Sequence, residues 1–385
     1  MPFSLISYSA PVIRQTVARV DLEAIAANVA ALRVLLDEQE TPPGIIAVVK
    51  ANAYGHGAIA VARKLEEAGV DILACADIEE SIELRQAGIT RPILVFGALS
   101  VSDLDGIFDF DLTPTVSTPT AAQAIEDAGA RRGAVVGCHL KIDTGMNRLG
   151  FRHDNLDRTM PAIAASRHVR IDAVYTHFAC ADNPDAQSFE DQRLRFEHAL
   201  AVLDRHGIRP KVRHAANSAA TLRDQRTWYD FVRPGLLLYG IVPPPLGSTL
   251  PFHPALSLTS RVVAVKGLRP GEGVGYGLRY TPTEPRQVAV VPAGYADGVD
   301  TRLANTGFAL VRGRRAPIVG SVCMDMIMLD VTDLGVQTGD EVVLIGRQGG
   351  DEISAREVAA TIGTIPWEVI CRLGSRIARS YEPGL

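Results

Sequence analysis

The sequence lacks several features that mark common classes of protein. Its five cysteines are odd in number, lie far apart along 385 residues and form no CxxC pair, which argues against a disulfide framework and favours a reducing compartment. The net charge is −5 and no long run of lysine or arginine occurs, so we expect no nucleic-acid partner. Neither a Walker-A nor a GxGxxG motif is present, which argues against a nucleoside triphosphate or dinucleotide ligand. We expect no metal site.

Long hydrophobic runs are absent as well. No segment approaches the roughly 18 apolar residues of a membrane span, so we expect no membrane partner. The N-terminal "MPFSLISYSAPVIRQ" has no basic region ahead of an apolar stretch, so we expect no signal peptide and a cytoplasmic location. Hydrophobic residues make up 47% and charged residues 22% of the chain, which is typical of a globular protein.

Residues 20–240 instead alternate between short apolar runs and helix-like stretches. The alternation predicts a parallel α/β sheet, and eight strands is the number that closes a (β/α)8 barrel of the TIM type. An open doubly wound sheet is the alternative. The eight expected strands cover residues 45–49, 71–76, 92–97, 112–116, 135–143, 170–178, 211–216 and 236–241. The clearest expected helices cover residues 58–69, 78–88, 118–129 and 188–207.

The pattern changes at "VPPPLGSTLPFHP", a linker rich in proline at residues 242–254. Strand-like runs without long helices follow, up to a helical stretch at residues 354–376. We therefore expect a barrel domain at 15–245 and a mainly β domain at 246–385, which could also include residues 1–14.

In a barrel of this kind, the active site lies just beyond the carboxyl ends of the strands. In "IIAVVKANAYGHG" this position holds Lys50, where the ordinary interpretation is a lysine whose ammonium reaches water. Other strand ends bring a second lysine, two arginines and a histidine to the same rim: Lys141, Arg148, Arg233 and His177. Each has an ordinary structural interpretation, but salt bridges alone rarely gather so many cations.

A rim rich in cations requires an anion, and the last two loops favour phosphate. "HAANSAAT" places Asn217 and Ser218 where a helix should begin, and "RPG" adds the backbone N–H of Gly235. A phosphate beside a lysine at a strand end suggests pyridoxal 5′-phosphate, joined to Lys50 as an imine. Burial of a lysine lowers its pKa, which makes the neutral amine available for such a bond.

Eight motifs together carry a family resemblance. They are "AVVKANAYGHG", "HLKIDTGMNRLG", "YTHFACAD", "HAANSAA", "RPGLLLYG", "VGYG", "GYADG" and "GSVCMDM". In order and spacing the chain resembles bacterial alanine racemases, from about residue 18 to residue 381. The resemblance implies an N-terminal (β/α)8 barrel, a C-terminal mainly β domain, pyridoxal 5′-phosphate as cofactor and a homodimer with shared active sites.

The resemblance also implies a mechanism with two catalytic bases. Lys50 would move the α-proton on the D side of alanine, and Tyr276 in "VGYG", reaching over from the partner subunit, would act on the L side. Arg233 would face the pyridine nitrogen of the cofactor. Arg148 would contact the phenolic oxygen of the cofactor and the substrate carboxylate, and Lys141 corresponds to a lysine that is often carbamylated.

The remaining roles follow from the same resemblance. Met324 would help to hold the substrate carboxylate through its backbone, and Tyr295 would line the entrance. The other residues expected to bind the cofactor are Tyr54, His177, Asn217, Ser218, Gly235, Leu236 and Trp367. Many family members have a tyrosine in place of Trp367, a serine in place of Gly275 and a glutamine in place of Met326. The tryptophan makes the substrate size less certain, because this ring borders the substrate methyl group in the family.

The expected activity is that of an alanine racemase, which supplies D-alanine for peptidoglycan. A racemase of the same fold with broader specificity, acting on serine for example, is the nearest alternative. A one-domain, non-catalytic pyridoxal phosphate carrier is disfavoured by the second domain. A fold-related decarboxylase should have an acidic residue where Arg233 stands.

Overall fold

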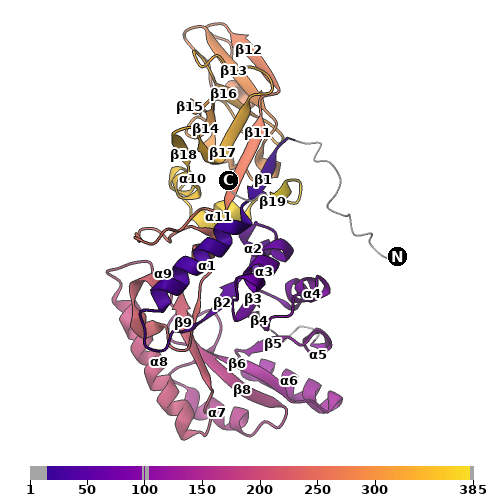
Figure 1. Cartoon of the computed structure of the whole chain (residues 1–385), viewed down its shortest axis with the longest axis vertical. Coiled ribbons are helices and arrows are strands. Elements are labelled where there is room, and N and C mark those ends of the chain that lie inside the picture. Colours follow the sequence, from indigo (N-terminus) through magenta and orange to yellow (C-terminus); the bar gives the residue numbers. More distant parts are fainter. Residues whose placement is uncertain (1–14, 98, 100–103, 382–385) are drawn as a thin grey trace. The chain divides into compact units, whose positions relative to one another are not determined.

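The computed structural model describes residues 15–97, 99 and 104–381 (Figure 1). The chain divides into two compact units, which are described separately below. The barrel unit comprises Leu22–Ala255, and the C-terminal unit comprises Leu256–Leu385 together with the residues up to Asp21. Among the described residues, no helix is both long and apolar enough to span a membrane.

The barrel unit contains eight parallel strands that close on themselves, since the last strand pairs with the first. This confirms the expected (β/α)8 barrel and removes the open sheet from consideration. In their order around the barrel the strands are β2 (Gly44–Val48), β3 (Ile72–Cys75), β4 (Ile93–Val95), β5 (Thr113–Val116), β6 (Val136–Asp143), β8 (Val169–Tyr175), β9 (Val212–Asn217) and β10 (Phe231–Arg233). The short β7 (Phe151–Arg152) pairs with the end of β6.

Helices follow the strands, as the alternation predicts. They are α1 (Leu22–Leu36), α2 (Lys50–Tyr54), α3 (Ala58–Glu67), α4 (Ile78–Gln86), α5 (Asp105–Asp109), α6 (Pro119–Arg132), α7 (Leu156–Ala164), α8 (Gln187–Arg205) and α9 (Ser218–Arg223). Local sequence explains their limits. Thr118 caps α6 by accepting the N–H of Ala121, Pro119 occupies its first turn, and Gly133 ends it in a left-handed conformation.

The eighth predicted strand is wrong. Residues 236–241, "LLLYGI", form a buried 3₁₀ turn, η3 (Leu236–Tyr239), and Gly240 follows it with φ at 75°. The eighth strand is the preceding β10, which ends at Arg233 before a proline. A short apolar run reports burial but does not distinguish a strand from a helical turn.

The C-terminal unit is built mainly of strands, as expected. Its larger sheet has the order β15-β14-β17-β11-β1-β19 with β18 attached to β17, and its smaller sheet has the order β12-β13-β16. The larger sheet contains β1 (Val17–Val20), β11 (Leu256–Arg261), β14 (Phe308–Val311), β15 (Arg314–Pro317), β17 (Glu341–Gln348), β18 (Asp351–Ile353) and β19 (Ala378–Tyr381). The smaller contains β12 (Ala264–Leu268), β13 (Arg286–Val291) and β16 (Ile327–Asp330). The helical stretch consists of two short helices, α10 (Ala355–Ile362) and α11 (Pro366–Cys371).

The two units differ from the expected domain limits of 15–245 and 246–385 at two places. β1 belongs to the C-terminal unit because it lies between β11 and β19. Residues 246–255 belong to the barrel unit, where the side chain of Asn28 donates to the carbonyl of His253 and accepts its N–H. Residues 1–14, which the sequence left open, lie outside the described residues.

Candidate active site

Lys50 stands just beyond the end of β2, at the start of an unusual turn. The four residues from Ala51 to Tyr54 have φ between 52° and 54°, so the segment labelled α2 is a left-handed turn. This conformation costs an L-residue roughly 1–2 kcal/mol. Strain of this kind persists only where the surroundings enforce it, and it is concentrated at functional sites. The strained backbone after Lys50 therefore indicates that this turn has a function.

A carboxylate holds this turn in place. Glu80, on α4, accepts the backbone N–H of Ala51 at 2.7 Å and that of Ala76 at 2.9 Å. It thereby joins the segments that follow β2 and β3. The sequence analysis missed Glu80, because nothing in one sequence indicates that a helical carboxylate will meet two backbone donors.

Tyr54 ends the turn and lies beside Gly235, which follows β10. A Cβ atom on Gly235 would come within 2.6 Å of the Tyr54 hydroxyl oxygen, so only glycine fits there. The N–H of Gly235 donates to Oγ of Ser218 at 2.9 Å. Two hydroxyls and a backbone N–H therefore converge in the barrel unit, with Leu236 next in the chain. Asn217 has a different part: its side chain caps α9 by accepting the N–H of Ala220.

Arg233 ends β10 and is only 3% exposed. Its Nη1 lies 2.8 Å from Nδ1 of His214, and its Nη2 donates to the carbonyl oxygens of Thr176 and Ala215. Nη2 also lies 3.3 Å from Nδ1 of His177. Burial lowers the pKa of Arg233 to about 10, so the guanidinium stays charged at neutral pH.

Both histidines around Arg233 are neutral. Burial, followed by the positive charge of Arg233, holds the pKa of His177 and that of His214 well below the ordinary value. A neutral imidazole can accept a hydrogen bond, which a guanidinium requires of every neighbour. The pair of histidines therefore orients Arg233 without neutralising its charge.

Lys141 points into the barrel from β6 and is 6% exposed. Burial, and next the charges of Arg148 and Arg233, lower its pKa to about 8. Asp143 does not form an ion pair with it, because that carboxylate accepts the N–H groups of Gly145 and Asn147. Among the described residues, neither Lys141, Arg148 nor Arg233 forms an ion pair with a carboxylate. This rim therefore carries positive charge that its own chain does not neutralise.

Three of the expected site residues in the C-terminal unit, Tyr276, Tyr295 and Met324, are exposed. Tyr276, in η4 (Tyr276–Leu278), is 78% exposed, and its carbonyl accepts from Oγ of Ser321. Tyr295 opens η5 (Tyr295–Asp297), where its N–H donates to the carbonyl of Cys323, next to Met324. These contacts bring the segments that carry the tyrosines and Met324 together. We call the exposed apolar residues Tyr276, Leu278, Tyr295, Met324 and Met326 the exposed strip.

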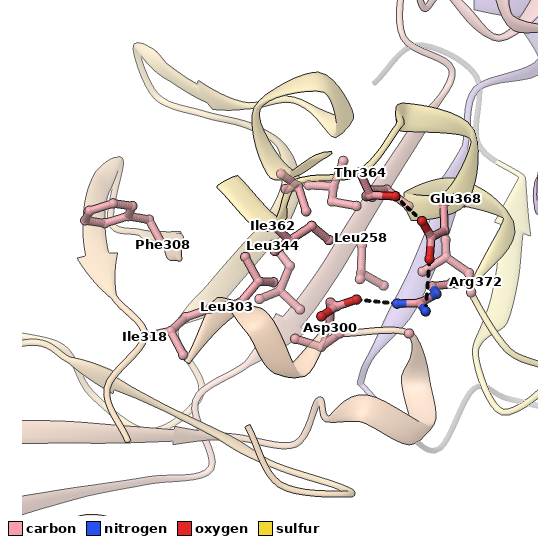
Figure 2. A pocket seen from close by; sticks show the side chains of 16 residues that line it. Leu258, Asp300, Leu303, Phe308, Ile318, Leu344, Ile362, Thr364, Glu368 and Arg372 are labelled. Atoms are coloured by element: carbon pink, nitrogen blue, oxygen red, sulfur yellow. Dashed lines mark hydrogen bonds and ion pairs between the residues drawn. The ribbon is translucent and has the colours of Figure 1, made fainter. Parts of the chain in front are cut away.

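Trp367 is partly buried on α11, the helix whose Glu368 and Val369 help to line a pocket of the C-terminal unit (Figure 2). Apolar side chains line most of this pocket, whereas Asp300, Thr364, Glu368 and Arg372 line one side. Arg372 binds both Asp300 and Glu368. Hydrogen bonds from Arg302, together with the positive charges of Arg302 and Arg372, lower the pKa of Asp300 to about 2, although burial acts in the opposite direction. The ion network thus anchors the helix that carries Trp367.

The expected site residues therefore fall into two groups. The barrel unit brings together Tyr54, Ser218 and Gly235, and separately Arg233 with His177. The C-terminal unit brings together Tyr276, Tyr295 and Met324. Among the described residues, no cluster of three or more histidine, cysteine or acidic side chains could hold a metal ion.

Comparison with known proteins identifies the family of the chain. Residues 20–243 match the family model of the alanine racemase N-terminal domain, and residues 255–381 match that of the C-terminal domain. An alanine racemase of Symbiobacterium thermophilum is 43% identical over 370 residues, which cover 96% of this chain and 97% of that protein. One of Geobacter sulfurreducens is 39% identical over 374 residues, with 96% and 97% covered.

Solved structures show the same likeness over the whole fold. The alanine racemase of a D-cycloserine-producing Streptomyces lavendulae has a TM-score of 0.92 at 36% identity, with 97% of this chain and 98% of that chain covered. The enzyme of Bacillus anthracis with bound L-Ala-P has a TM-score of 0.88 at 37% identity, with 97% and 96% covered. The chain belongs to the alanine racemase family.

Proposed function

We propose that this protein interconverts L- and D-alanine, with pyridoxal 5′-phosphate as cofactor and with Lys50 and Tyr276 as the two bases. The observation that carries the proposal is the rim of the barrel. There Lys50 follows β2 at the start of a strained turn, and neither Arg148 nor Arg233 forms an ion pair with a carboxylate of the described chain. Such a rim suits an anionic cofactor and a substrate with a carboxylate.

The residues of the barrel fit this cofactor. The hydroxyls of Tyr54 and Ser218 and the N–H groups of Gly235 and Leu236 would hold its phosphate. The Gly235 position supports this, because a side chain there would fill the space in front of the Tyr54 hydroxyl. Asn217 would contribute by fixing the start of α9. When bound, the conjugated ring of the cofactor withdraws electrons from the substrate Cα and so makes its hydrogen acidic.

Arg233 would face the ring nitrogen of the cofactor through a group that donates but does not release its proton. A guanidinium has no acceptor atom and loses its proton only at very high pH. The ring nitrogen would therefore stay unprotonated, which weakens electron withdrawal and restrains side reactions. His177, 3.3 Å from Nη2 of Arg233, would pack beside the same ring.

Two bases on opposite faces of the substrate would move the proton. Nζ of Lys50 would take it from, or return it to, the D side, and the hydroxyl oxygen of Tyr276 would do the same on the L side. Because Tyr276 is largely exposed in its own unit, we propose that it serves the site of the partner subunit. Arg148 and the N–H of Met324 would bind the substrate carboxylate, and Tyr295 would line the entrance.

Lys141 would act as a carbamate. A neutral amine adds to CO₂ and releases one proton, so the modification converts a cation into an anion. The lowered pKa of about 8 supports this, because about a tenth of the amine is then neutral at pH 7. The carbamate would hold Arg148 through a charge-assisted hydrogen bond.

We further propose a homodimer, cytoplasmic location and a role in supplying D-alanine for peptidoglycan. The exposed strip supports the dimer, since it places five large, exposed apolar side chains on segments that hydrogen bonds bring together. A mixing experiment tests whether the sites are shared. When Lys50→Ala and Tyr276→Phe chains exchange subunits freely, half of the dimers are mixed and one of their two sites is intact. We expect about a quarter of wild-type activity from shared sites, and no recovery if each chain holds a complete site.

Trp367 favours a second candidate, a racemase that also accepts serine. The indole N–H is a donor only, so it cannot reproduce every contact of the tyrosine found at this position in many family members. An assay of the purified protein on a panel of L-amino acids, with alanine and serine side by side, separates the two. Turnover of alanine at least about tenfold above serine supports the first candidate, comparable turnover supports the second, and no racemisation of either contradicts both.

A further inference from the structure

Two buried histidines extend inward from Arg233, and only the nearer one touches it. His214, on β9, lies between Arg233 and His139, on β6: its Nε2 is 3.0 Å from Nδ1 of His139. β6 and β9 are separated by β8, and alternate strands of a barrel fill the same interior layer. Tyr175 of β8 stacks flat on His214, with ring centroids 4.7 Å apart and an interplanar angle of 9°. The position of the His214 ring is therefore fixed.

The protons of both histidines follow from the chemistry of Arg233. A guanidinium offers N–H groups and no acceptor, so Nδ1 of His214, at 2.8 Å from Nη1, has to carry a lone pair. The single proton of the neutral imidazole is then on Nε2. That N–H points at Nδ1 of His139, which has to be a lone pair too, so the proton of His139 is on its own Nε2. One donor-only residue thus determines the tautomers of two rings.

The other proton arrangements of His214 place a donor against a donor. A proton on Nδ1 would oppose the N–H of Arg233, and a doubly protonated ring would do so as well. Burial and the positive charge of Arg233 disfavour the second arrangement. The tautomer with its proton on Nδ1 becomes competitive only if the acceptor on His139 is removed. That acceptor is what favours a proton on Nε2 of His214. Replacing that acceptor would leave a buried N–H unsatisfied.

We propose that His139 is a positioning residue for the racemisation, which keeps Nδ1 of His214 an acceptor and thereby holds the guanidinium of Arg233 in place. The role of Arg233 toward the cofactor rests on the proposed function, whereas the tautomers of the histidines do not. His139 hydrogen-bonds to His214, and it would act on Arg233 through that ring.

The sequence carries a signal for this residue that is easy to overlook. His139 precedes Lys141 by two positions in "HLKID", and residues two apart on a strand share a face. Lys141 is buried in the barrel, and His139 is buried on the same face of β6. Its partner could not be found in this way, because the distance across two strands is not encoded locally.

The first test reads the tautomers directly. The ring nitrogens of the full-length protein labelled with ¹⁵N-histidine are observed by NMR, with and without added pyridoxal 5′-phosphate, and assigned from the His139→Gln and His214→Gln variants. Ring nitrogens with and without a proton have well separated ¹⁵N shifts. We expect a proton on Nε2 and none on Nδ1 in both histidines. A proton on Nδ1 of His214 would overturn the proposal, whatever the activity of the protein.

The second test separates positioning from packing. His139→Gln keeps an acceptor oxygen, whereas His139→Leu has none. We expect kcat to fall about tenfold in His139→Leu, the factor that corresponds to one hydrogen bond of typical strength, with KM within about twofold, and to fall much less in His139→Gln. Equal losses in the two variants, or a wild-type kcat in His139→Leu, would overturn the proposal.

His168→Leu is the matched control. The ring of His168 is half-buried in the same unit and lies 3.0 Å from the carbonyl oxygen of Ala134, so the variant also removes one histidine contact. We expect wild-type kcat from it. Thermal unfolding of all variants shows whether the barrel remains folded. If the wild-type protein had no racemase activity, the proposed function would fail, while the tautomer measurement would still decide on the histidines.

Discussion

The two units hold their site residues in different ways. In the barrel unit Tyr54, Ser218, Lys141 and Arg233 are buried. Arg233 makes hydrogen bonds to two carbonyl oxygens and a histidine, and Ser218 binds Gly235. In the C-terminal unit Tyr276, Tyr295 and Met324 are exposed, and the hydrogen bonds of the two tyrosines to Ser321 and Cys323 involve their backbone only.

The site residues of the barrel unit are thus preorganised within one chain, and we call them the preorganised half. The exposed tyrosines of the C-terminal unit still have to be ordered, and we call them the exposed half. Fixed donors and charges can stabilise a reacting centre without further reorganisation. An exposed tyrosine ring keeps its rotamer freedom until a surface covers it, so its ordering has to accompany assembly. Each half can therefore be tested by variants that leave the other half intact.

The largest effect is expected from Lys50→Ala in the preorganised half. Loss of the base and of the amine that joins the cofactor should lower racemisation by at least about 10⁴-fold in both directions. Optical rotation of L- and D-alanine samples measures this. After borohydride treatment of the wild-type protein, mass mapping should find the cofactor on Lys50 alone.

Lys64→Ala is the control for that experiment. Lys64 lies in the same unit but forms surface ion pairs with Glu23 and Glu67, so its loss should leave kcat unchanged. Cofactor found on Lys64 or any other lysine would refute the role of Lys50.

Tyr276→Phe probes the exposed half, where we expect an asymmetric effect. Enantiomers are equally stable, so kcat/KM has to fall equally in the two directions and cannot reveal which face is affected. Exchange of the α-hydrogen in D₂O can reveal it. Exchange from L-alanine should fall roughly 10²-fold or more, whereas exchange from D-alanine should continue through Lys50. Equal loss from both enantiomers would contradict the assignment of the two bases.

The sequence predicted most of this fold because repeated local patterns encode it. Seven of the eight barrel strands and the C-terminal sheet follow from apolar runs and turn residues. The eighth strand was misplaced because Phe231–Arg233 is short and the apolar run after it forms a turn. β1 was assigned to the barrel because a strand's partners, here β11 and β19, lie far away in the sequence.

For the site, the sequence and its family resemblance predict residues expected to touch ligands, but they miss residues that act through other residues. Lys50 and Arg233 stand in recognisable motifs at strand ends. Glu80 and His139 do not, because their partners are backbone N–H groups and a ring that only the closed barrel brings near.

A variant of Lys141 tests how much the burial of this amine in the barrel unit lowers the stability of the folded chain. Its pKa, lowered by burial from 10.5 to about 8, means that the charged form is disfavoured in the folded chain. Stability should therefore be reduced below pH 8 and should recover as the pH rises toward 10.5. In CO₂-free buffer at pH 7, Lys141→Met should raise the free energy of unfolding by about 2 kcal/mol, and the gain should shrink above pH 8.

Urea unfolding of the two proteins across this pH range measures the gain, and Lys64→Met provides a contrast of opposite sign. Ion pairs with Glu23, and then Glu67, raise the pKa of Lys64, so its removal should cost stability, by about 0–1 kcal/mol for a surface pair. If Lys141→Met instead lost stability at pH 7, the charge of the buried amine would have to be stabilised by other groups of the folded chain.

Leu278→Glu tests the exposed residues of the C-terminal unit. We expect it to leave the stability of the single chain nearly unchanged and to weaken the dimer. Leu278 is 62% exposed beside Tyr276, and Val34 on α1 of the barrel unit is 66% exposed. A carboxylate at an interface loses its hydration without gaining a partner, so Leu278→Glu should weaken the dimer by at least about tenfold in Kd, whereas Val34→Glu should not. Sedimentation measures the dimer, and activity per chain should fall on dilution in Leu278→Glu only. If both variants remain equally dimeric, the exposed strip is not the interface, and the exposure of Tyr276 would need an explanation other than a site completed by a second chain.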